Sequence, residues 1–270
     1  MPVSQVETRI ANEQTIMPIR LYGNWFSTFA RKVAIGLELK GLPYEPIDAL
    51  TREFRSELVR LNPRAEVPVL TDDELTVVNS SDILQYLEWR YPDPPLYPAG
   101  IAERVAARAL ERLADDRFDP IVVDCSFWHW ADRDDNPPTG LLETGQRDLD
   151  ATFTKLEAAL ANRSKPWPFG APGLVECAWF ANLAAVRPLG FKIDEGRFPA
   201  VDGWLRAMRS HPVFAADAKR TAAFLKTLKQ SSHERRRLFW SGARVEWLLA
   251  RGFHHWLLAE IEAGRAVFPD

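Results

Sequence analysis

The sequence has few cysteines, no metal-ligand spacing, no long apolar run and almost no excess of charge. Its two cysteines, Cys125 and Cys177, lie far apart in apolar surroundings, so we expect buried free thiols in a reducing, cytoplasmic compartment. Neither a zinc site nor a CxxC redox pair is expected. A net charge of −3, with one short arginine run at 235–237, favours no nucleic-acid partner. No apolar stretch is long enough to cross a membrane, and segment 1–17 lacks the apolar core of a signal peptide.

Aromatic side chains are abundant, with ten tryptophans and fifteen phenylalanines in 270 residues. Such side chains fill cores and also line pockets for apolar ligands. After the polar segment 1–17, read as a disordered or extended tail, the pattern predicts the order β-α-β-α-β-β-α. The expected elements are a strand at 18–23, a helix at 27–40, a strand at 42–50, a helix at 53–61, a hairpin at 67–78 and a helix at 80–91.

A proline-rich linker separates this α/β half, residues 18–92, from a helical half. The stretch YPDPPLYPAG holds four prolines in ten residues, and we place the linker at 93–100. Helical periodicity then predicts an all-α bundle over 101–230, with an interruption near Pro120. Residues 231–270 carry two more amphipathic helices, which form a C-terminal extension. These helices either fold over the cleft between the halves or cover the helical half.

Four motifs in this order resemble those of one family. They are S-x-x-x-R-K-V (Ser27 to Val33), LNPRAEVPVL (61–70), NSSDILQYLEWRYP (79–92) and FPAVDGWLRAMRSHP (198–212). The chain is similar, from about Pro18 to about Ala216, to the cytosolic glutathione S-transferases of serine type. The resemblance implies a thioredoxin-like domain followed by an all-helical domain. It also implies a homodimer, glutathione as co-substrate and no metal.

The stretch LYGNWFSTFARKV places a hydroxyl where a strand ends and a helix begins. From spacing alone, Ser27 is a helix N-cap. The resemblance instead implies that Ser27 activates the thiol of glutathione, because a hydroxyl that donates to sulfur stabilises the thiolate. Thr28 and Asn24 stay open as alternatives for this role. A serine cannot form the mixed disulfide of a thiol reductase, so that activity is excluded.

The resemblance also assigns residues to glutathione and to an apolar second substrate. The glutathione contacts it implies are Asn24, Thr28, Phe29, Lys40, Glu66, Val67, Pro68, Asn79, Ser80 and Ser81. Pro68 would form a cis peptide bond with Val67, whose backbone would pair with the tripeptide, and Ser80 would hold the glutamyl carboxylate at a helix N-terminus. The pocket for the electrophile would be lined by Trp25, Phe26, Phe118 and Trp128.

Two residues depart from the family pattern. Glu66 stands where many relatives carry a basic or amide residue, which either weakens glutathione binding or shifts contacts to Arg64, Lys40 or Arg52. Asn79 stands where the family usually has an acidic or amide residue, and it offers less charge complementarity to the glutathione amine than an acid would. The expected activity is attack of glutathione thiolate on an electrophilic carbon, with conjugation, ether cleavage, dehalogenation or isomerisation as outcomes. The alternative is a non-catalytic relative that serves as a binding or regulatory protein.

Overall fold

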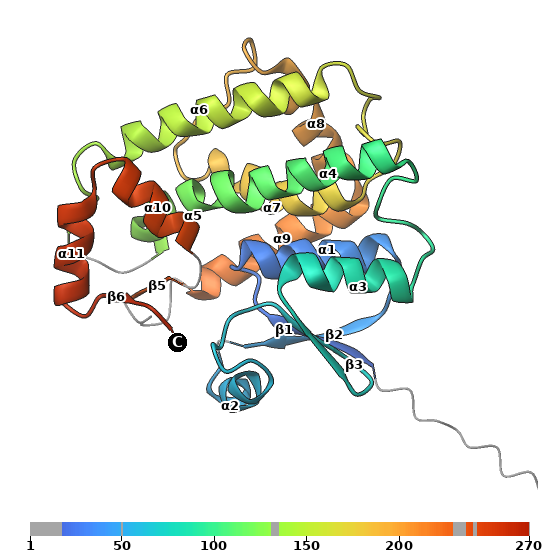
Figure 1. The fold of residues 1–270 in the computed structure, drawn as a ribbon, viewed down its shortest axis with the longest axis horizontal. Helices are drawn as coiled ribbons and strands as arrows, with labels where there is room; N and C mark the ends of the chain where they lie inside the picture. Colours follow the sequence, from blue (N-terminus) through green and yellow to red (C-terminus); the bar gives the residue numbers. More distant parts are fainter. Residues whose placement is uncertain (1–17, 50, 131–134, 229–235, 240–241, 270) are drawn as a thin grey trace, which may run out of the picture.

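The computed structural model describes residues 18–49, 51–130, 135–228, 236–239 and 242–269. The tail expected at 1–17 lies outside these residues. The described chain has an N-terminal half built on a sheet and a C-terminal half built from helices (Figure 1). This is the thioredoxin-like and all-helical arrangement that the sequence predicts.

The N-terminal half contains a four-stranded sheet in the order β2-β1-β3-β4. Its elements are β1 (Ile19–Gly23), α1 (Thr28–Leu39), β2 (Tyr44–Asp48), α2 (Arg52–Leu61), β3 (Val69–Asp72), β4 (Leu75–Val78) and α3 (Ser80–Arg90). Strand β1 runs parallel to β2 and antiparallel to β3, which in turn pairs antiparallel with β4. Helices α1 and α3 lie between the sheet and the helical half, whereas α2 lies on the opposite side of the sheet (Figure 1).

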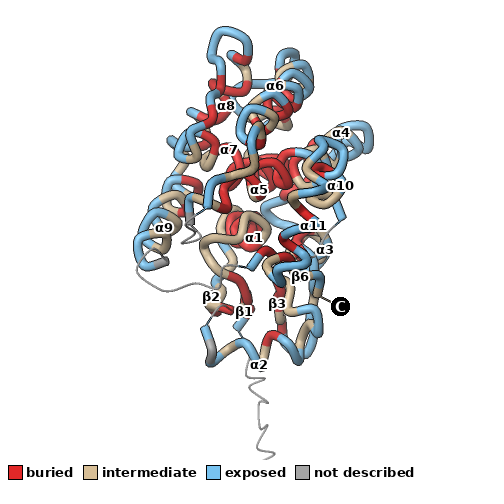
Figure 2. The backbone as a smooth tube through the Cα atoms, turned by 90° about the vertical axis from the view of Figure 1, so that its left-hand side faces the viewer, coloured by how far each residue is buried: buried red, intermediate tan, exposed pale blue. Residues whose placement is uncertain are grey.

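Helix α1 is buried almost all round because it is covered on both sides. Val33, Ala34 and Leu37 have no exposed surface and belong to the main core. The cationic residues Arg31 and Lys32 are buried in the same helix, so each needs a carboxylate partner from another element. The red part of the tube in Figure 2 gathers around α1, α5 and α7, which shows that the two halves share one core.

The helical half follows the linker. Its helices are α4 (Ile101–Leu113), the π-helical turn η1 (Ala114–Phe118), α5 (Asp119–Trp130), α6 (Leu141–Leu160), α7 (Leu174–Val186), α8 (Pro199–Ser210) and α9 (Pro212–Leu228). The interruption predicted near Pro120 is η1, which ends just before it. Proline has no N–H to continue an α-helical ladder, and a wider turn accommodates that loss. All of these helices lie within the predicted all-α segment 101–230.

The C-terminal extension forms β5 (Arg237–Leu238), α10 (Gly242–Ala250), α11 (His254–Glu262) and β6 (Ala266–Val267). The two helices were predicted, but the short parallel pairing of β5 with β6 was not. Helix α10 packs against α5, and the indole N–H of Trp247 donates to Asp148 in α6 at 2.9 Å. The extension therefore covers one end of the helical half.

Candidate functional site

Three polar segments meet at one edge of the sheet. Tyr22, next to the end of β1, pairs with Val69, the first residue of β3, and Val69 pairs with Val78, the last residue of β4. The segments that adjoin these positions, residues 24–29, 66–68 and 79–81, therefore converge. We call this the junction site. It contains twelve of the fifteen predicted site residues before any contact is considered.

The turn between β1 and α1 is held by Asn24. Its side-chain oxygen accepts the backbone N–H groups of Phe26 and Ser27, both at 2.9 Å. Gly23 lets this turn close tightly, because a Cβ there would lie 2.6 Å from the Cβ of Ala30. Asn24 thus shapes the turn and presents the N-terminus of α1.

Ser27 is the N-cap of α1. Its Oγ accepts the N–H of Ala30 at 3.2 Å, and the residue is half-buried. Within the described residues its own hydroxyl hydrogen has no acceptor. Across the same part of the chain the N–H groups of Thr28 and Phe29 also lack acceptors, as expected in a first helical turn. Three donors at the positive end of a helix dipole are therefore available to an anion.

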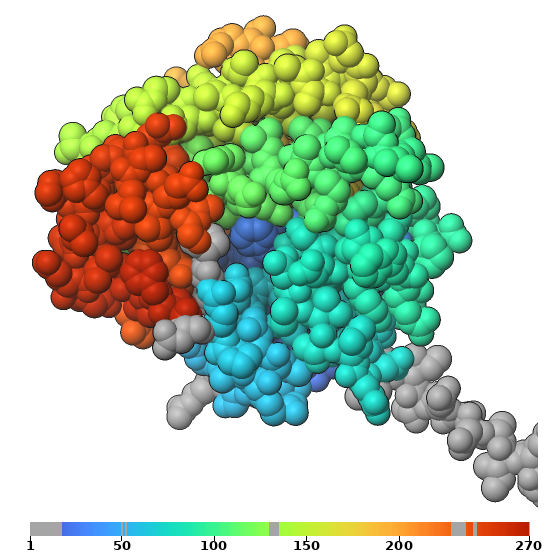
Figure 3. All heavy atoms as spheres, in the orientation of Figure 1, coloured from blue at the N-terminus to red at the C-terminus, as the bar shows by residue number. Residues whose placement is uncertain are grey.

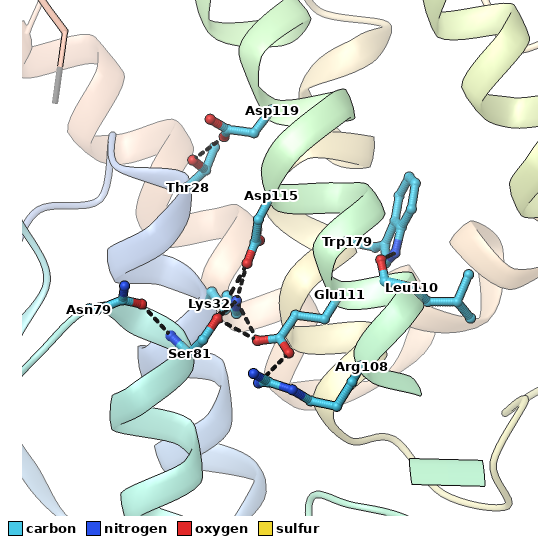
Figure 4. Close-up of polar contacts among 10 residues, drawn as sticks. All are labelled: Thr28, Lys32, Asn79, Ser81, Arg108, Leu110, Glu111, Asp115, Asp119 and Trp179. Carbon is cyan, nitrogen blue, oxygen red and sulfur yellow. Dashed lines mark hydrogen bonds and ion pairs between the residues drawn. The ribbon is translucent and has the colours of Figure 1, made fainter. Parts of the chain in front are cut away.

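Thr28 uses its hydroxyl differently from Ser27. Its Oγ1 donates to Oδ1 of Asp119, the first residue of α5, at 2.5 Å (Figure 4). Asp119 is 3% exposed, and burial raises its pKa to about 6 against the opposing hydrogen bonds from Thr28 and Asn182. Because the hydrogen of Thr28 is already donated, Ser27 is the hydroxyl of this turn that can donate to a ligand.

The segment before β3 contains Glu66 and a cis peptide bond between Val67 and Pro68, as the resemblance implied. Glu66 is half-buried, and this burial raises the pKa of its carboxyl against the opposing charge of Arg64. Asn62 orients the segment by donating from its amide to the carbonyl of Glu66 at 3.0 Å. The backbone here continues directly into the sheet edge beside Asn24.

At the start of α3 the N-cap is Asn79. Its φ is 72°, and its side-chain oxygen accepts the N–H of Ser81 at 3.0 Å. A positive φ is uncommon for residues other than glycine, and asparagine is among those that adopt it most often. The Ser80 hydroxyl has no protein partner within the described ranges and remains available to a ligand.

A buried group of charges joins α1, α3 and α4 beside the junction site (Figure 4). The ammonium of Lys32 lies 2.7 Å from Glu111 and 2.6 Å from Asp115, and it donates to Oγ of Ser81 at 3.1 Å. Ser81 donates in turn to Glu111 at 2.8 Å. Arg108 pairs with the other oxygen of Glu111 at 2.6 Å. The Ser81 hydroxyl is therefore committed to the protein, and its predicted role as a direct glutathione ligand is corrected.

Two further predicted residues lie away from the junction site. Lys40 follows the far end of α1, about 20 Å of helix rise from Ser27. Its ammonium is bound to Glu88 at 3.1 Å and to the carbonyls of Tyr91 and Pro94. Phe118 has no exposed surface, because it packs between Phe153 and Trp179 in the core. Lys40 thus braces the linker, and Phe118 does not line a pocket.

The remaining predicted aromatics lie at the borders of the site. Trp25 and Phe26 are half-buried in the β1–α1 turn, and the guanidinium of Arg220 from α9 lies 4.7 Å from the Trp25 ring centre. Trp128 is half-buried under the extension, 5.8 Å from the ring of Trp256. Phe29 is half-buried in the first turn of α1. Figure 3 shows a hollow whose blue floor belongs to the start of the described chain, bordered by α2, the helical half and the extension.

Sequence reasoning missed the acidic residues that the helical half contributes. Glu111, Asp115 and Asp119 recur every four residues, so they share one side of the continuous α4–η1–α5 rod. All three carry buried or nearly buried carboxylates that face α1 and α3. The sequence signal that could have indicated them is the four-residue spacing of acids among the apolar residues of a buried helix.

The described residues contain no group of three or more potential ligand side chains that could hold a metal ion. None of the described helices is both long and apolar enough to span a membrane.

Comparison with known proteins gives consistent matches to one family. Residues 21–95 match the family model described as glutathione S-transferase, N-terminal domain. A probable maleylacetoacetate isomerase of Vibrio cholerae is 43% identical over 107 residues, which cover 37% of this chain and 50% of that protein. Glutathione S-transferase Z1 of Arabidopsis thaliana is 39% identical over 89 residues, 32% of this chain and 40% of that protein. This chain spans about half the length of the curated relatives it matches.

Solved structures extend the likeness to both halves. Maleylacetoacetate isomerase from Anaeromyxobacter dehalogenans, determined with glutathione in its active site, superposes with a TM-score of 0.60 at 28% identity. That alignment covers 75% of this chain and 96% of the other. A glutathione S-transferase from Rhodospirillum rubrum gives a TM-score of 0.64 at 24% identity, over 74% of this chain and 91% of the other, and shows the shared fold.

Proposed function

We propose that this chain, which belongs to the glutathione S-transferase family, binds glutathione at the junction site and uses Ser27 to keep its sulfur ionised. The observation that carries the proposal is the half-buried Ser27 hydroxyl, whose hydrogen has no acceptor in the described chain. A free thiol has a pKa of about 8.5, so most glutathione is protonated at neutral pH. A donated hydrogen bond and two helical N–H groups favour the thiolate, which is the nucleophile.

The other two segments of the junction site suit the rest of a tripeptide. Val67 precedes the cis peptide bond at the start of β3, where the glutathione backbone would pair with its main chain. Ser80, at the start of α3, offers a hydroxyl and a helix N-terminus to the glutamyl carboxylate.

The reaction we propose is addition of the thiolate to an electrophilic carbon of an apolar substrate. In conjugation the sulfur stays bonded to that carbon, and in a glutathione-dependent isomerisation it leaves again and glutathione is regenerated. Relatives named as transferases and as maleylacetoacetate isomerases both match this chain, so both outcomes belong to the proposal. Trp25 and Phe26, beside Ser27, would contact the apolar substrate.

The test measures glutathione binding by calorimetry and the thiolate of bound glutathione by ultraviolet absorbance as a function of pH. Ser27→Ala should raise the thiol pKa by one to two units and lower conjugation at pH 7 by about 10- to 100-fold. Ser56→Ala, which removes an exposed hydroxyl from α2, is the matched control. Turnover at pH 7 that is unchanged by Ser27→Ala would refute the role of Ser27. Binding without any thiolate in the wild type would favour the non-catalytic alternative.

We also propose that the chain forms a homodimer. Large apolar side chains are exposed near the end of α3, where Trp89 is 75% exposed, and at the start of α4, where Ile101 is 83% exposed. Val105, one turn further along α4, is also exposed. A second copy of the chain would bury this surface, which fits the dimers typical of the family. Ile101→Glu should convert the dimer to a monomer in analytical ultracentrifugation, and a wild type that sediments as a monomer would contradict the proposal.

A further inference from the structure

The three acids on the α4–η1–α5 rod, Glu111, Asp115 and Asp119, form what we call the carboxylate ladder. Its side chains point from the helical half toward the first turns of α1 and α3 (Figure 4). The partners on α1, Thr28 and Lys32, are also four residues apart, so two helical faces with the same spacing oppose each other. Because the spacings match, each acid of the ladder can bond to a specific polar side chain on the opposing helix.

The Asp119 end of the ladder acts on the turn that carries Ser27. The 2.5 Å bond from Thr28 ties the first residue of α1 to the first residue of α5. It also consumes the Thr28 hydrogen, so that hydroxyl does not compete with Ser27 as a donor to sulfur. Asp119 is fully enclosed by protein, and its contact to Asn182 of α7 holds the carboxylate from the other side.

The other end of the ladder acts on the turn that carries Ser80. Glu111 accepts the hydroxyl of Ser81, and Lys32 bridges Ser81, Glu111 and Asp115. With Arg108, this group has two positive and two negative charges, so the buried charges compensate one another. The first turn of α3 is therefore anchored to α4 through the residue next to Ser80.

We propose that the carboxylate ladder positions the two ends of bound glutathione separately. Asp119, through Thr28, sets the Ser27 hydroxyl at the sulfur, whereas Glu111 and Asp115, through Ser81, set the α3 N-terminus at the glutamyl carboxylate. The three acids of the ladder are positioning residues that touch no substrate atom. The inference rests on the proposed function, since it assigns the two ends of its ligand.

Kinetics separate the two ends. Thr28→Val keeps the side-chain shape without the hydroxyl, and it should lower kcat about tenfold and shift the pH–rate profile upward, with KM for glutathione within twofold. Ser81→Ala should raise that KM about tenfold with kcat within twofold. Thr28→Ser should restore the wild-type values. Thr152→Val, which removes a buried hydroxyl bonded within α6, is the matched control and should change neither constant.

Amide hydrogen exchange of the ligand-free protein tests the positioning without glutathione. Thr28→Val should speed exchange at Ala30 and Arg31, and Ser81→Ala should speed it at Ile83, each without affecting the other helix. Should Thr28→Val fail to fold, Asp119→Asn weakens the same bond and should act in the same direction. The proposal is overturned if Thr28→Val and Ser81→Ala change the same kinetic constant, or if Thr152→Val changes kcat as much as Thr28→Val does. It is also overturned if neither variant changes amide exchange. A wild type that does not bind glutathione refutes the proposed function instead, whatever the exchange data show.

Discussion

Arg237 is the anchor by which the C-terminal extension holds the helical half, and its replacement is the most direct test of that packing. The side chain is fully buried and lies 2.9 Å from Asp124 of α5, which is also fully buried. Its guanidinium carbon is 4.0 Å from the ring centre of Phe127, 4.5 Å from that of Trp128 and 4.8 Å from that of Trp256. We consider Arg237→Met, which keeps the apolar stem and removes the charge.

The expected loss of stability follows from what the variant leaves behind. Removing one partner of a buried ion pair costs about 3–5 kcal/mol, because the other charge stays buried. Arg244 still pairs with Asp124 at 2.5 Å, which places the cost toward the lower end of that range. The lost contacts with the three rings add about 0.5–2 kcal/mol. We therefore expect Arg237→Met to lower the free energy of unfolding by about 3–5 kcal/mol.

Urea unfolding followed by tryptophan fluorescence measures this change, with Arg117→Met as the control. Arg117 also reaches the extension, through Glu246 at 3.0 Å, but both of these side chains are more than half exposed. Such a surface pair contributes about 0–1 kcal/mol. If the two variants lose the same stability, or if Arg237→Met loses less than 1 kcal/mol, the account of a buried anchor is wrong.

Two further predictions concern buried carboxyls. Glu176 accepts the N–H of Gly173 at 2.8 Å and the indole N–H of Trp204 at 2.9 Å. Glu176→Ala leaves these two buried donors without an acceptor, so it should lower the free energy of unfolding in urea by about 2–5 kcal/mol. A loss below about 1 kcal/mol would contradict this. Asp119 has a pKa of about 6 in the folded protein and about 3.8 unfolded, so its contribution to stability is fully present below pH 3.8 and is lost as the pH rises through 6. The wild type should therefore lose about 3 kcal/mol relative to Asp119→Asn between pH 3.5 and pH 7, and parallel pH profiles of the two proteins would refute the assignment.

The sheet half was predictable because local signals and global packing agree there. Turn residues, alternating apolar positions and the glycine at the end of the predicted helix 27–40 all indicate the observed elements. The misses fall where tertiary contacts decide the outcome. Strands β5 and β6 are two residues long and exist only because Arg237 and Ala266 lie side by side in the folded extension. No window of sequence contains both, so periodicity could not reveal them.

The junction site likewise has features that local sequence predicts and features that depend on tertiary contacts. Ser27, Val67 and Ser80 lie next to strand ends or helix starts, and local sequence places such positions well. The hydrogen-bond partner of each hydroxyl could not be predicted from local sequence, because it lies about 30 to 90 positions away. Thr28 is excluded as a thiol donor only by Asp119, and Ser81 is excluded as a ligand only by Glu111.

This division explains why Lys40 was misassigned. A lysine soon after the first helix is a reasonable anion ligand when only the sequence is considered. In the fold, however, α1 lies at the centre of the shared core. The buried ammonium of Lys40 therefore needs hydrogen-bond acceptors close to the end of this helix. The carbonyls of Tyr91 and Pro94 and the carboxylate of Glu88 meet that need at the start of the linker. The same requirement gives Arg31 its partner Asp217 in α9 at 2.6 Å. Arg31 and Lys32 of α1 therefore join the two halves, and we propose that anions bind at the N-terminal turns of α1 and α3.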